Sequence, residues 1–276
     1  MITRSNKRKS NRKTRKLLEL ECKKNRSNKF LIGTSGFMIS QKKWMDLACL
    51  NCIEINGTFY RLPTENTINK WKEFPPHVSI VIKASRYITH MKRLKNVEDA
   101  WKLLWNKIQP LGKRLKCILF QLPPSFAYND VNLQRIIDMH KYVPKDLSIA
   151  FEFRNSSWLN EKVYKTFKSL KWCIVSTYIQ KNEGTSWMGT MPGGLNIPPK
   201  TANFTYLRIH GARGYKGELD NKELKKIRSE ITKQKSNKNF VMFNNTFFNS
   251  RSNYCIVDNI KIKYAAVCNA VEFSSI

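Results

Sequence analysis

The chain has 276 residues, 41% of them hydrophobic, and a formal net charge of +30 at pH 7. A chain of this size can bury one large core, so we expect one domain of about 240 residues plus a tail. No apolar run reaches the roughly 18 residues that a membrane span needs, and the basic N-terminus lacks the apolar segment of a secretory signal. The sequence therefore predicts an intracellular protein with no membrane partner. We expect it in the cytoplasm, or in the nucleus if its basic N-terminal run is a localisation signal.

Part of this charge is concentrated at the N-terminus, where residues 1–29 hold 12 lysines and arginines against two glutamates. So polar and self-repelling a segment predicts a disordered basic arm, with a short helix at LLELECKK (17–24). The arm could be a nuclear-localisation signal, a phosphate-binding segment or a solvated tail. A basic surface also attracts polyanions, which makes nucleic acid a candidate partner. AT-rich coding favours lysine and asparagine as well, so charge alone leaves both explanations open.

The chain has seven cysteines, an odd number. Cys52, Cys117 and Cys173 lie within expected strands, which is typical of reduced core thiols in an intracellular protein. Cys49 and Cys52 form a lone C-x-x-C pair without a second pair at zinc spacing. We therefore interpret them as small core residues.

Strands and helices alternate from Phe30 onward. Apolar runs typical of buried strands occupy residues 30–36, 52–58, 79–85, 116–122, 148–154, 172–177, 203–210 and 239–244. Helical segments are expected at 40–50, 65–73, 97–109, 131–141, 159–170, 220–235 and 259–272. The segment 178–202 breaks the alternation, because its MPGGLNIPP run cannot hold a regular helix. This order predicts an α/β fold, a (β/α)8 TIM-type barrel over residues 30–276 with a degraded sixth helix. The alternative is an open, doubly wound sheet.

Polar side chains recur near the carboxyl end of each expected strand, which is the working face of such a barrel. They are Thr34, Glu54, Asn56, Lys83, Gln121, Glu152, Arg154, Arg208, His210 and Asn244. Two acids there face three cations and a histidine. The sequence therefore predicts a pocket for a small anionic or polar ligand, such as one carrying a phosphate.

Four of these residues are candidates for catalysis: Glu54, Lys83, Glu152 and His210. Glu54 and Glu152 could form the acid–base pair that glycosidases use, or could be structural carboxylates that bridge buried cations. Lys83 could be a nucleophile or an electrostatic clamp. Two nearby carboxylates are expected to raise its pKa, which argues against Schiff-base chemistry.

The other candidates are expected to contact the ligand. Arginine is suited to gripping a carboxylate or phosphate with two parallel bonds, which is the role we expect for Arg154 and Arg208. The remaining contacts are expected from Thr34, Asn56, Tyr60, His90, Gln121 and Asn244. The face offers few His, Asp and Glu ligands and several cations, so we expect no metal and no cofactor.

The same segments resemble one known family. The motifs that carry the resemblance are GTSG (33–36), EINGTFYRLP (54–63), VIKASRYITH (81–90), FQLPP (120–124), FEFRNSSW (151–158), YLRIHG (206–211) and FNN (243–245). In this order they look like the YecE-like family, also called domain of unknown function 72. That resemblance implies a TIM-type barrel of unestablished activity. Phe37, Gly57 and Asn155 depart from the family's usual Trp, Ser and His, and residues 246–265 look like an insertion that changes the rim.

Two classes of function follow from the sequence. The first is a metal-independent enzyme or ligand-binding barrel that takes a phosphorylated or sugar-like ligand. The alternative is a nucleic-acid-binding protein that uses the basic arm and surface, by analogy with endonuclease-IV-like barrels. A barrel retained for an interaction role is a third possibility.

Overall fold

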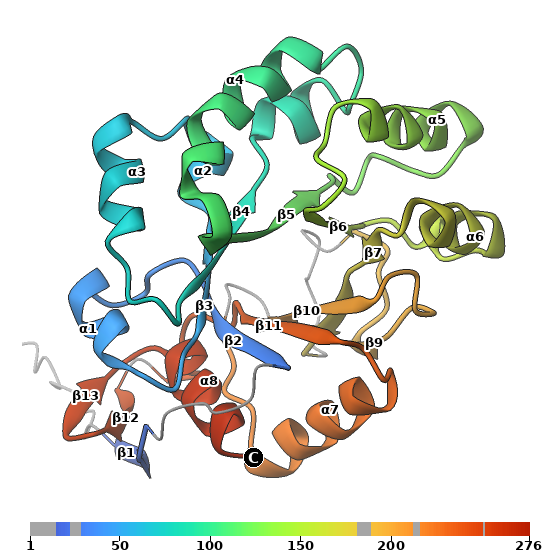
Figure 1. Cartoon of the computed structure of the whole chain (residues 1–276). Coiled ribbons are helices and arrows are strands. Elements are labelled where there is room, and N and C mark those ends of the chain that lie inside the picture. Colours follow the sequence, from blue (N-terminus) through green and yellow to red (C-terminus); the bar gives the residue numbers. More distant parts are fainter. Residues whose placement is uncertain (1–14, 23–28, 181–188, 212–215, 251) are drawn as a thin grey trace, which may run out of the picture.

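The computed structural model describes residues 15–22, 29–180, 189–211, 216–250 and 252–276. These residues form a large curled sheet with helices around its outer side and a small second sheet next to it (Figure 1). The large sheet has ten strands in the order β7-β6-β5-β4-β3-β2-β11-β10-β8-β9. Among the described helices, none is long and apolar enough to cross a membrane.

The strands of the large sheet are parallel, except that β9 pairs antiparallel with β8. Their bounds are β2 (Phe30–Ser35), β3 (Cys52–Ile55), β4 (Ser79–Lys83), β5 (Leu115–Gln121), β6 (Ser148–Glu152), β7 (Cys173–Ile174), β8 (Ser176–Ile179), β9 (Gly194–Asn196), β10 (Phe204–His210) and β11 (Lys238–Phe243). Each of the eight expected apolar runs contains a strand of this sheet, and the sixth run is divided at Val175. Its first part, β7, pairs with β6, and its second part, β8, pairs with β10. The predicted α/β class is confirmed.

Eight α-helices follow or connect these strands in the described residues. They are α1 (Gln41–Asp46), α2 (Gly57–Tyr60), α3 (Glu65–Lys72), α4 (Glu98–Ile108), α5 (Asp130–Asp138), α6 (Glu161–Leu170), α7 (Asn221–Lys233) and α8 (Ala265–Ser275). Short helical turns of other types span Tyr87–Met91, Gln109–Arg114, Met139–Lys141 and Ser156–Trp158. Five of these helices begin at a side-chain cap, provided by Ser40, Thr64, Asn129, Asn160 and Asp220. Such caps fix a helix start because they accept a hydrogen bond from a backbone N–H that has no partner within the helix.

The last predicted helix starts later than expected. The sequence predicted a start at residue 259, but β12 (Asn253–Val257) and β13 (Ile260–Ile262) form a hairpin there and α8 begins at Ala265. Asp258 and Asn259 have φ of 46° and 65°, the backbone that a two-residue hairpin turn requires. The segment 178–202 contains β9 in its described part. Residues 181–188 lie outside the described residues, so the degraded sixth helix stays a prediction.

The small sheet corrects the expectations for the N-terminal arm. Residues Arg15–Leu20 form β1, a strand that pairs parallel with β12, and the sheet order is β1-β12-β13. The described part of the arm is therefore neither a helix nor disordered, while residues 1–14 and 23–28 lie outside the described residues. The strand forms through its pairing with β12, which lies more than 230 residues away along the chain. Local periodicity does not reveal such a distant pairing.

Two disulfides accompany this sheet. Cys22, just after β1, is bonded to Cys49, and Cys255 of β12 is bonded to Cys268 of α8. The expectation that Cys49 is merely a small core residue is therefore wrong. Cys52, Cys117 and Cys173 are buried free thiols, as predicted.

The parity of each strand determines which side chains reach the concave side of the large sheet. Successive side chains of a strand point to opposite faces. One buried cluster consists of hydrophobic residues on the concave side, among them Cys52, Val81, Ala150 and Tyr206. The residues between them belong to the larger core outside the sheet, under the helices. Two positions further along each strand, the concave face continues into the polar residues of the predicted site.

Candidate functional site

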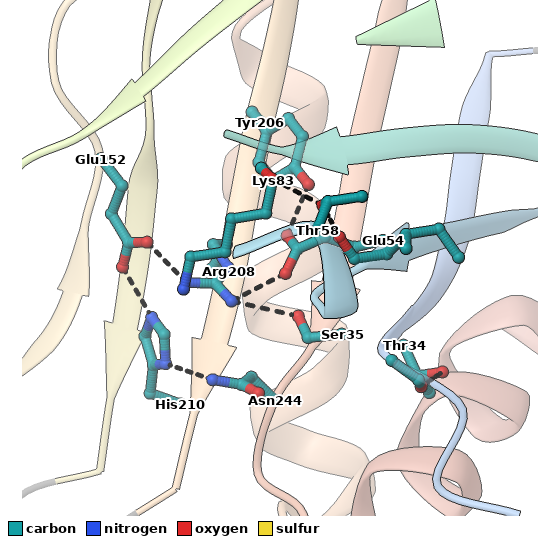
Figure 2. Close-up of polar contacts among 12 residues, drawn as sticks. Thr34, Ser35, Glu54, Thr58, Lys83, Glu152, Tyr206, Arg208, His210 and Asn244 are labelled. Atoms are coloured by element: carbon teal, nitrogen blue, oxygen red, sulfur yellow. Dashed lines mark hydrogen bonds and ion pairs between the residues drawn. The ribbon is translucent and has the colours of Figure 1, made fainter. Parts of the chain in front are cut away.

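The candidate site lies at the carboxyl ends of the strands, where side chains from β3, β4, β6 and β10 and from the ends of β2 and β11 converge (Figure 2). Glu54 is two residues beyond Cys52, Lys83 two beyond Val81, and Arg208 two beyond Tyr206. Each thus continues the concave face of its strand. Parallel strands bring these ends to one edge of the sheet, which explains why residues far apart in sequence meet.

Arg208 is at the centre of this cluster. Its Nη2 donates to Glu54 Oε1 at 2.8 Å and its Nη1 donates to Glu152 Oε2 at 2.5 Å. The second oxygen of Glu54 accepts from the hydroxyl of Tyr206 at 2.7 Å. Because the side chain of Arg208 is about 2% exposed, these contacts replace the water that its charge would otherwise need. The two carboxylates raise its pKa further above its ordinary value, which keeps it charged.

Glu152 has three basic neighbours. Besides Arg208, its Oε1 accepts from Arg154 Nη2 at 2.8 Å and lies 3.0 Å from His210 Nε2. Burial acts to raise the pKa of this carboxyl, but Arg154 and Arg208 outweigh it and hold the pKa well below its usual range. Glu152 is therefore ionised, and both of its oxygens are occupied by protein donors.

His210 is neutral. Burial lowers its pKa to about 3, even though the hydrogen bond to Glu152 acts in the opposite direction. The contacts of the ring assign its tautomer: Nε2 carries the proton and donates to Glu152, and Nδ1 accepts from the amide of Asn244 at 3.2 Å. His210 thus orients Asn244 at the end of β11.

A pocket of about 280 Å³ opens beside this cluster. Its lining consists of Asn56, Tyr60, Lys83, Gln121, Arg154, Arg208, Asn244 and Thr246. Three of these side chains are cations, the others are amides, a hydroxyl and a phenol, and none is a carboxylate. Glu54, Glu152 and His210 are fully buried and do not line the pocket. They lie behind its wall and support the cations that do.

Lys83 differs from the two arginines. Within the described residues its ammonium forms no ion pair, and it lies over the Phe59 ring, 4.1 Å from the centroid. Thr58 holds the strand end in place, because its hydroxyl is 2.7 Å from the carbonyl of Lys83. Burial, followed by the charge of Arg208, lowers the pKa of Lys83 to about 7. The sequence predicted that the carboxylates would raise it. That prediction is wrong, because both carboxylates are already paired with arginines and the desolvation of the ammonium outweighs their attraction.

His90 lies next to this lysine but outside the pocket wall. Its ring contacts Phe59, with centroids 5.0 Å apart. The Thr89 hydroxyl donates to Ser85 O, so His90 Nδ1 is the donor in its 2.9 Å contact with Thr89 Oγ1. This leaves Nε2 as an acceptor that faces the Gln121 amide at 3.5 Å. Burial and then Lys83 lower the pKa of His90 to about 4, so the ring is a neutral base.

The structure thus divides the predicted site residues into three groups. Lys83, Arg154, Arg208, Asn56, Tyr60, Gln121 and Asn244 line the pocket. The predicted catalytic residues Glu54, Glu152 and His210 lie behind it, so their assignment to catalysis stays a prediction and the geometry favours positioning. Thr34 and His90 form the third group, which is outside the pocket lining. The hydroxyl of Thr34 accepts from the Trp44 indole and donates to Gly36 O.

Sequence reasoning missed Thr246, Ser35 and Tyr206. Thr246 lines the pocket, and Ser35 and Tyr206 contact Arg208 and Glu54. Strand parity could have found Tyr206, which is two residues before Arg208. Among the described residues, no group of three or more His, Cys, Asp or Glu side chains is arranged to hold a metal ion.

These features define a class: an α/β protein with a curled parallel sheet and a cationic pocket at its carboxyl edge. The chain belongs to the DUF72 family, since the model of "Protein of unknown function DUF72" matches residues 46–261. This confirms the resemblance read from the motifs. The UPF0759 protein YunF of Bacillus subtilis (strain 168) is 26% identical over 171 residues, which cover 58% of this chain and 58% of that relative.

Two solved structures of DUF72 family proteins are similar in fold. The protein from Thermotoga maritima has a TM-score of 0.72 and 22% identity, with 90% of this chain and 98% of that chain covered. The protein from Enterococcus faecalis has a TM-score of 0.71 and 19% identity, with 90% and 96% covered. At such identities the likeness extends to the fold alone.

Proposed function

We propose that this protein is a metal-independent enzyme with a TIM-type barrel that acts on a small phosphorylated or sugar-like ligand in the pocket beside Lys83. The barrel inference is supported by β2, which pairs with both β3 and β11, and by residues 173–179, which pair with β6 and β10. These pairings support a ring of eight parallel strands as part of the proposal. In such barrels the ligand binds at the carboxyl ends of the strands.

The observation that carries the proposal is the composition of the pocket wall. Lys83, Arg154 and Arg208 present three cationic groups to a space of about 280 Å³, and the compensating carboxylates are behind them. An anion in the pocket therefore meets donors and no like charge among the described residues of this wall. The amides of Asn56, Gln121 and Asn244 add the donors and acceptors that hydroxyl groups of a sugar need. The volume is at the small end of ligand sites, which favours a compact ligand.

The first test is sulfate binding measured by calorimetry between pH 6 and pH 9. Sulfate does not change its charge in this interval, whereas Lys83 loses its proton as the pH rises through about 7. We expect the affinity to fall at least about tenfold, because a hydrogen bond to a charged group contributes about 1.5–3 kcal/mol. Lys83→Met should bind weakly at both pH values.

The matched control is Lys107→Met, which removes an exposed lysine of α4 and should retain the wild-type pH dependence. Absence of sulfate binding to the wild type at pH 6, or equal affinity at pH 6 and pH 9, would contradict the proposal.

A second candidate function is nucleic-acid binding, and a different concavity favours it. A depression of about 880 Å³ lies at the opposite end of the sheet, around the starts of β6, β10 and β11. Its lining includes five lysines, Lys145, Lys168, Lys171, Lys200 and Lys238, and one acid, Asp146. A concave basic surface of this kind suits a phosphate backbone.

The salt dependence of binding tests this candidate. Changing Lys168, Lys171 and Lys200 to Gln should reduce the log–log slope of duplex-DNA affinity against salt by about 0.9 for each phosphate that these lysines neutralise. Lys102, Lys107 and Lys70, changed to Gln together, provide a control of equal charge. If both triple variants have the same slope, this concavity is not the interface.

A further inference from the structure

Lys83 differs chemically from the other described side chains of the pocket, since it is the primary amine among them. Its neighbours in the wall are two guanidinium groups, three amides, a phenol and a hydroxyl. Arg154 and Arg208 are held by Glu152 and Glu54. The ammonium of Lys83, by contrast, lies over the Phe59 ring at 4.1 Å with no carboxylate bonded to it in the described residues.

We propose that Lys83 forms an imine with the carbonyl carbon of a small anionic aldehyde or ketone bound in this pocket. The proposal rests on the proposed function and narrows its substrate class to compounds that carry both a carbonyl group and a phosphate or carboxylate. Arg154 and Arg208 provide the docking point for the anionic group, and Asn56, Gln121 and Asn244 contact the hydroxyls. The pocket has the volume of about nine water molecules at ~30 Å³ each, which suits a ligand the size of a triose phosphate.

Imine formation needs the unprotonated amine, because an ammonium has no lone pair with which to attack the carbonyl carbon. Burial, and next the charge of Arg208, lowers the pKa of Lys83 to about 7, so roughly half of the chains carry the free amine at neutral pH. Desolvation and a neighbouring cation are the two devices that activate nucleophilic lysines in general. The Phe59 ring excludes water from one side of the ammonium. Since no described carboxylate binds the nitrogen, its lone pair is accessible once the proton has left.

The step balances without any further reactant. Lys83 Nζ, as –NH2, adds to the carbonyl carbon and a C–N bond forms. One nitrogen proton moves to the former carbonyl oxygen, giving a carbinolamine. The second nitrogen proton leaves with that hydroxyl as water, and a C=N bond remains. Protonation of the imine from solvent then gives an iminium that withdraws electrons from the neighbouring carbon. His90, which contacts the same Phe59 ring and has an unprotonated Nε2, is a neutral base close to this step.

The test is reductive trapping. The full chain is incubated with dihydroxyacetone phosphate and sodium borohydride, and the adducts are located by peptide mass mapping. We expect about one adduct per chain, on Lys83, and at least a tenfold loss of labelling in Lys83→Arg, which retains a cation but cannot form an imine. Excess sulfate should suppress the labelling.

A matched control addresses general lysine reactivity. Burial also lowers the pKa of Lys116 on β5, but this residue does not line the pocket. Lys116→Arg should therefore retain full trapping at Lys83.

The outcomes separate this inference from the proposed function. If sulfate binds with the expected pH dependence but labelling is absent or is spread over surface lysines, the imine is wrong and the anion site stands. If sulfate fails to bind and no adduct forms, both are wrong.

Discussion

Replacing Glu152 with glutamine should lower the free energy of unfolding by about 3–5 kcal/mol, the range for removing one partner of a buried ion pair. The carboxylate accepts from Arg208, Arg154 and His210 and is completely buried. The amide keeps the shape but loses the charge, so two buried guanidinium groups lose part of their compensation. Chemical denaturation followed by circular dichroism measures the change.

Glu73→Gln provides the control, since Glu73 is an exposed carboxylate at the end of α3 and its loss should change stability by less than about 0.5 kcal/mol. The pH dependence gives a second check. The pKa of Glu152 lies well below its ordinary 4.5 in the folded protein, so its contribution is present above that value and is lost as the pH falls further. A Glu152→Gln protein within about 1 kcal/mol of the wild type would show that the cluster does not hold the fold together.

Replacing Lys83 with methionine should have the opposite effect and stabilise the protein near pH 6. Lys83 has its ordinary pKa near 10.5 in the unfolded chain and about 7 in the folded one. Between these values the unfolded state binds more protons, so the stability of the wild type should rise with pH from about 7 to 10.5. Methionine has a similar length and no charge, and should abolish this rise.

The expected gain is about 1–3 kcal/mol at pH 6, less than the full pKa difference implies, since the side chain has some exposure to the pocket and the substitution removes the cation–π interaction with Phe59. Lys107→Met, on the exposed face of α4, should leave the pH profile unchanged. A Lys83→Met protein that is less stable than the wild type at pH 6 would mean that the ammonium has a partner that compensates its burial.

The sequence predicted the strands and the convergence of the pocket residues well, because both follow from local rules. Apolar runs identify buried strands, and parity places Glu54, Lys83 and Arg208 on one face. Polar residues at the ends of parallel strands must then meet. Seven of the twelve predicted site residues line the pocket for this reason.

The predictions that were wrong or incomplete depend on distances within the folded chain, which a sequence does not contain. Strand parity predicts which face of the sheet a side chain is on, but not how far it lies from the pocket. Glu54 and Glu152 are on the predicted face but are buried behind the pocket wall. The pKa of Lys83 depends on whether the carboxylates are already occupied by Arg208 and Arg154. Strand β1 and the Cys22–Cys49 disulfide depend on non-local pairing of a basic segment whose composition favours disorder.

The proposed site depends on a largely buried Lys83 that has no ion pair with any described residue. The decisive experiment is an NMR titration of the lysine side chains, with the Lys83 signal assigned by its absence from the Lys83→Met spectrum. We expect Lys83 to titrate near pH 7, far below the ordinary 10.5, and to shift upward when sulfate is added. A Lys83 signal that titrates at about pH 10 or above in the absence of sulfate would show that the ammonium is solvated or paired, and the proposed site would then be wrong.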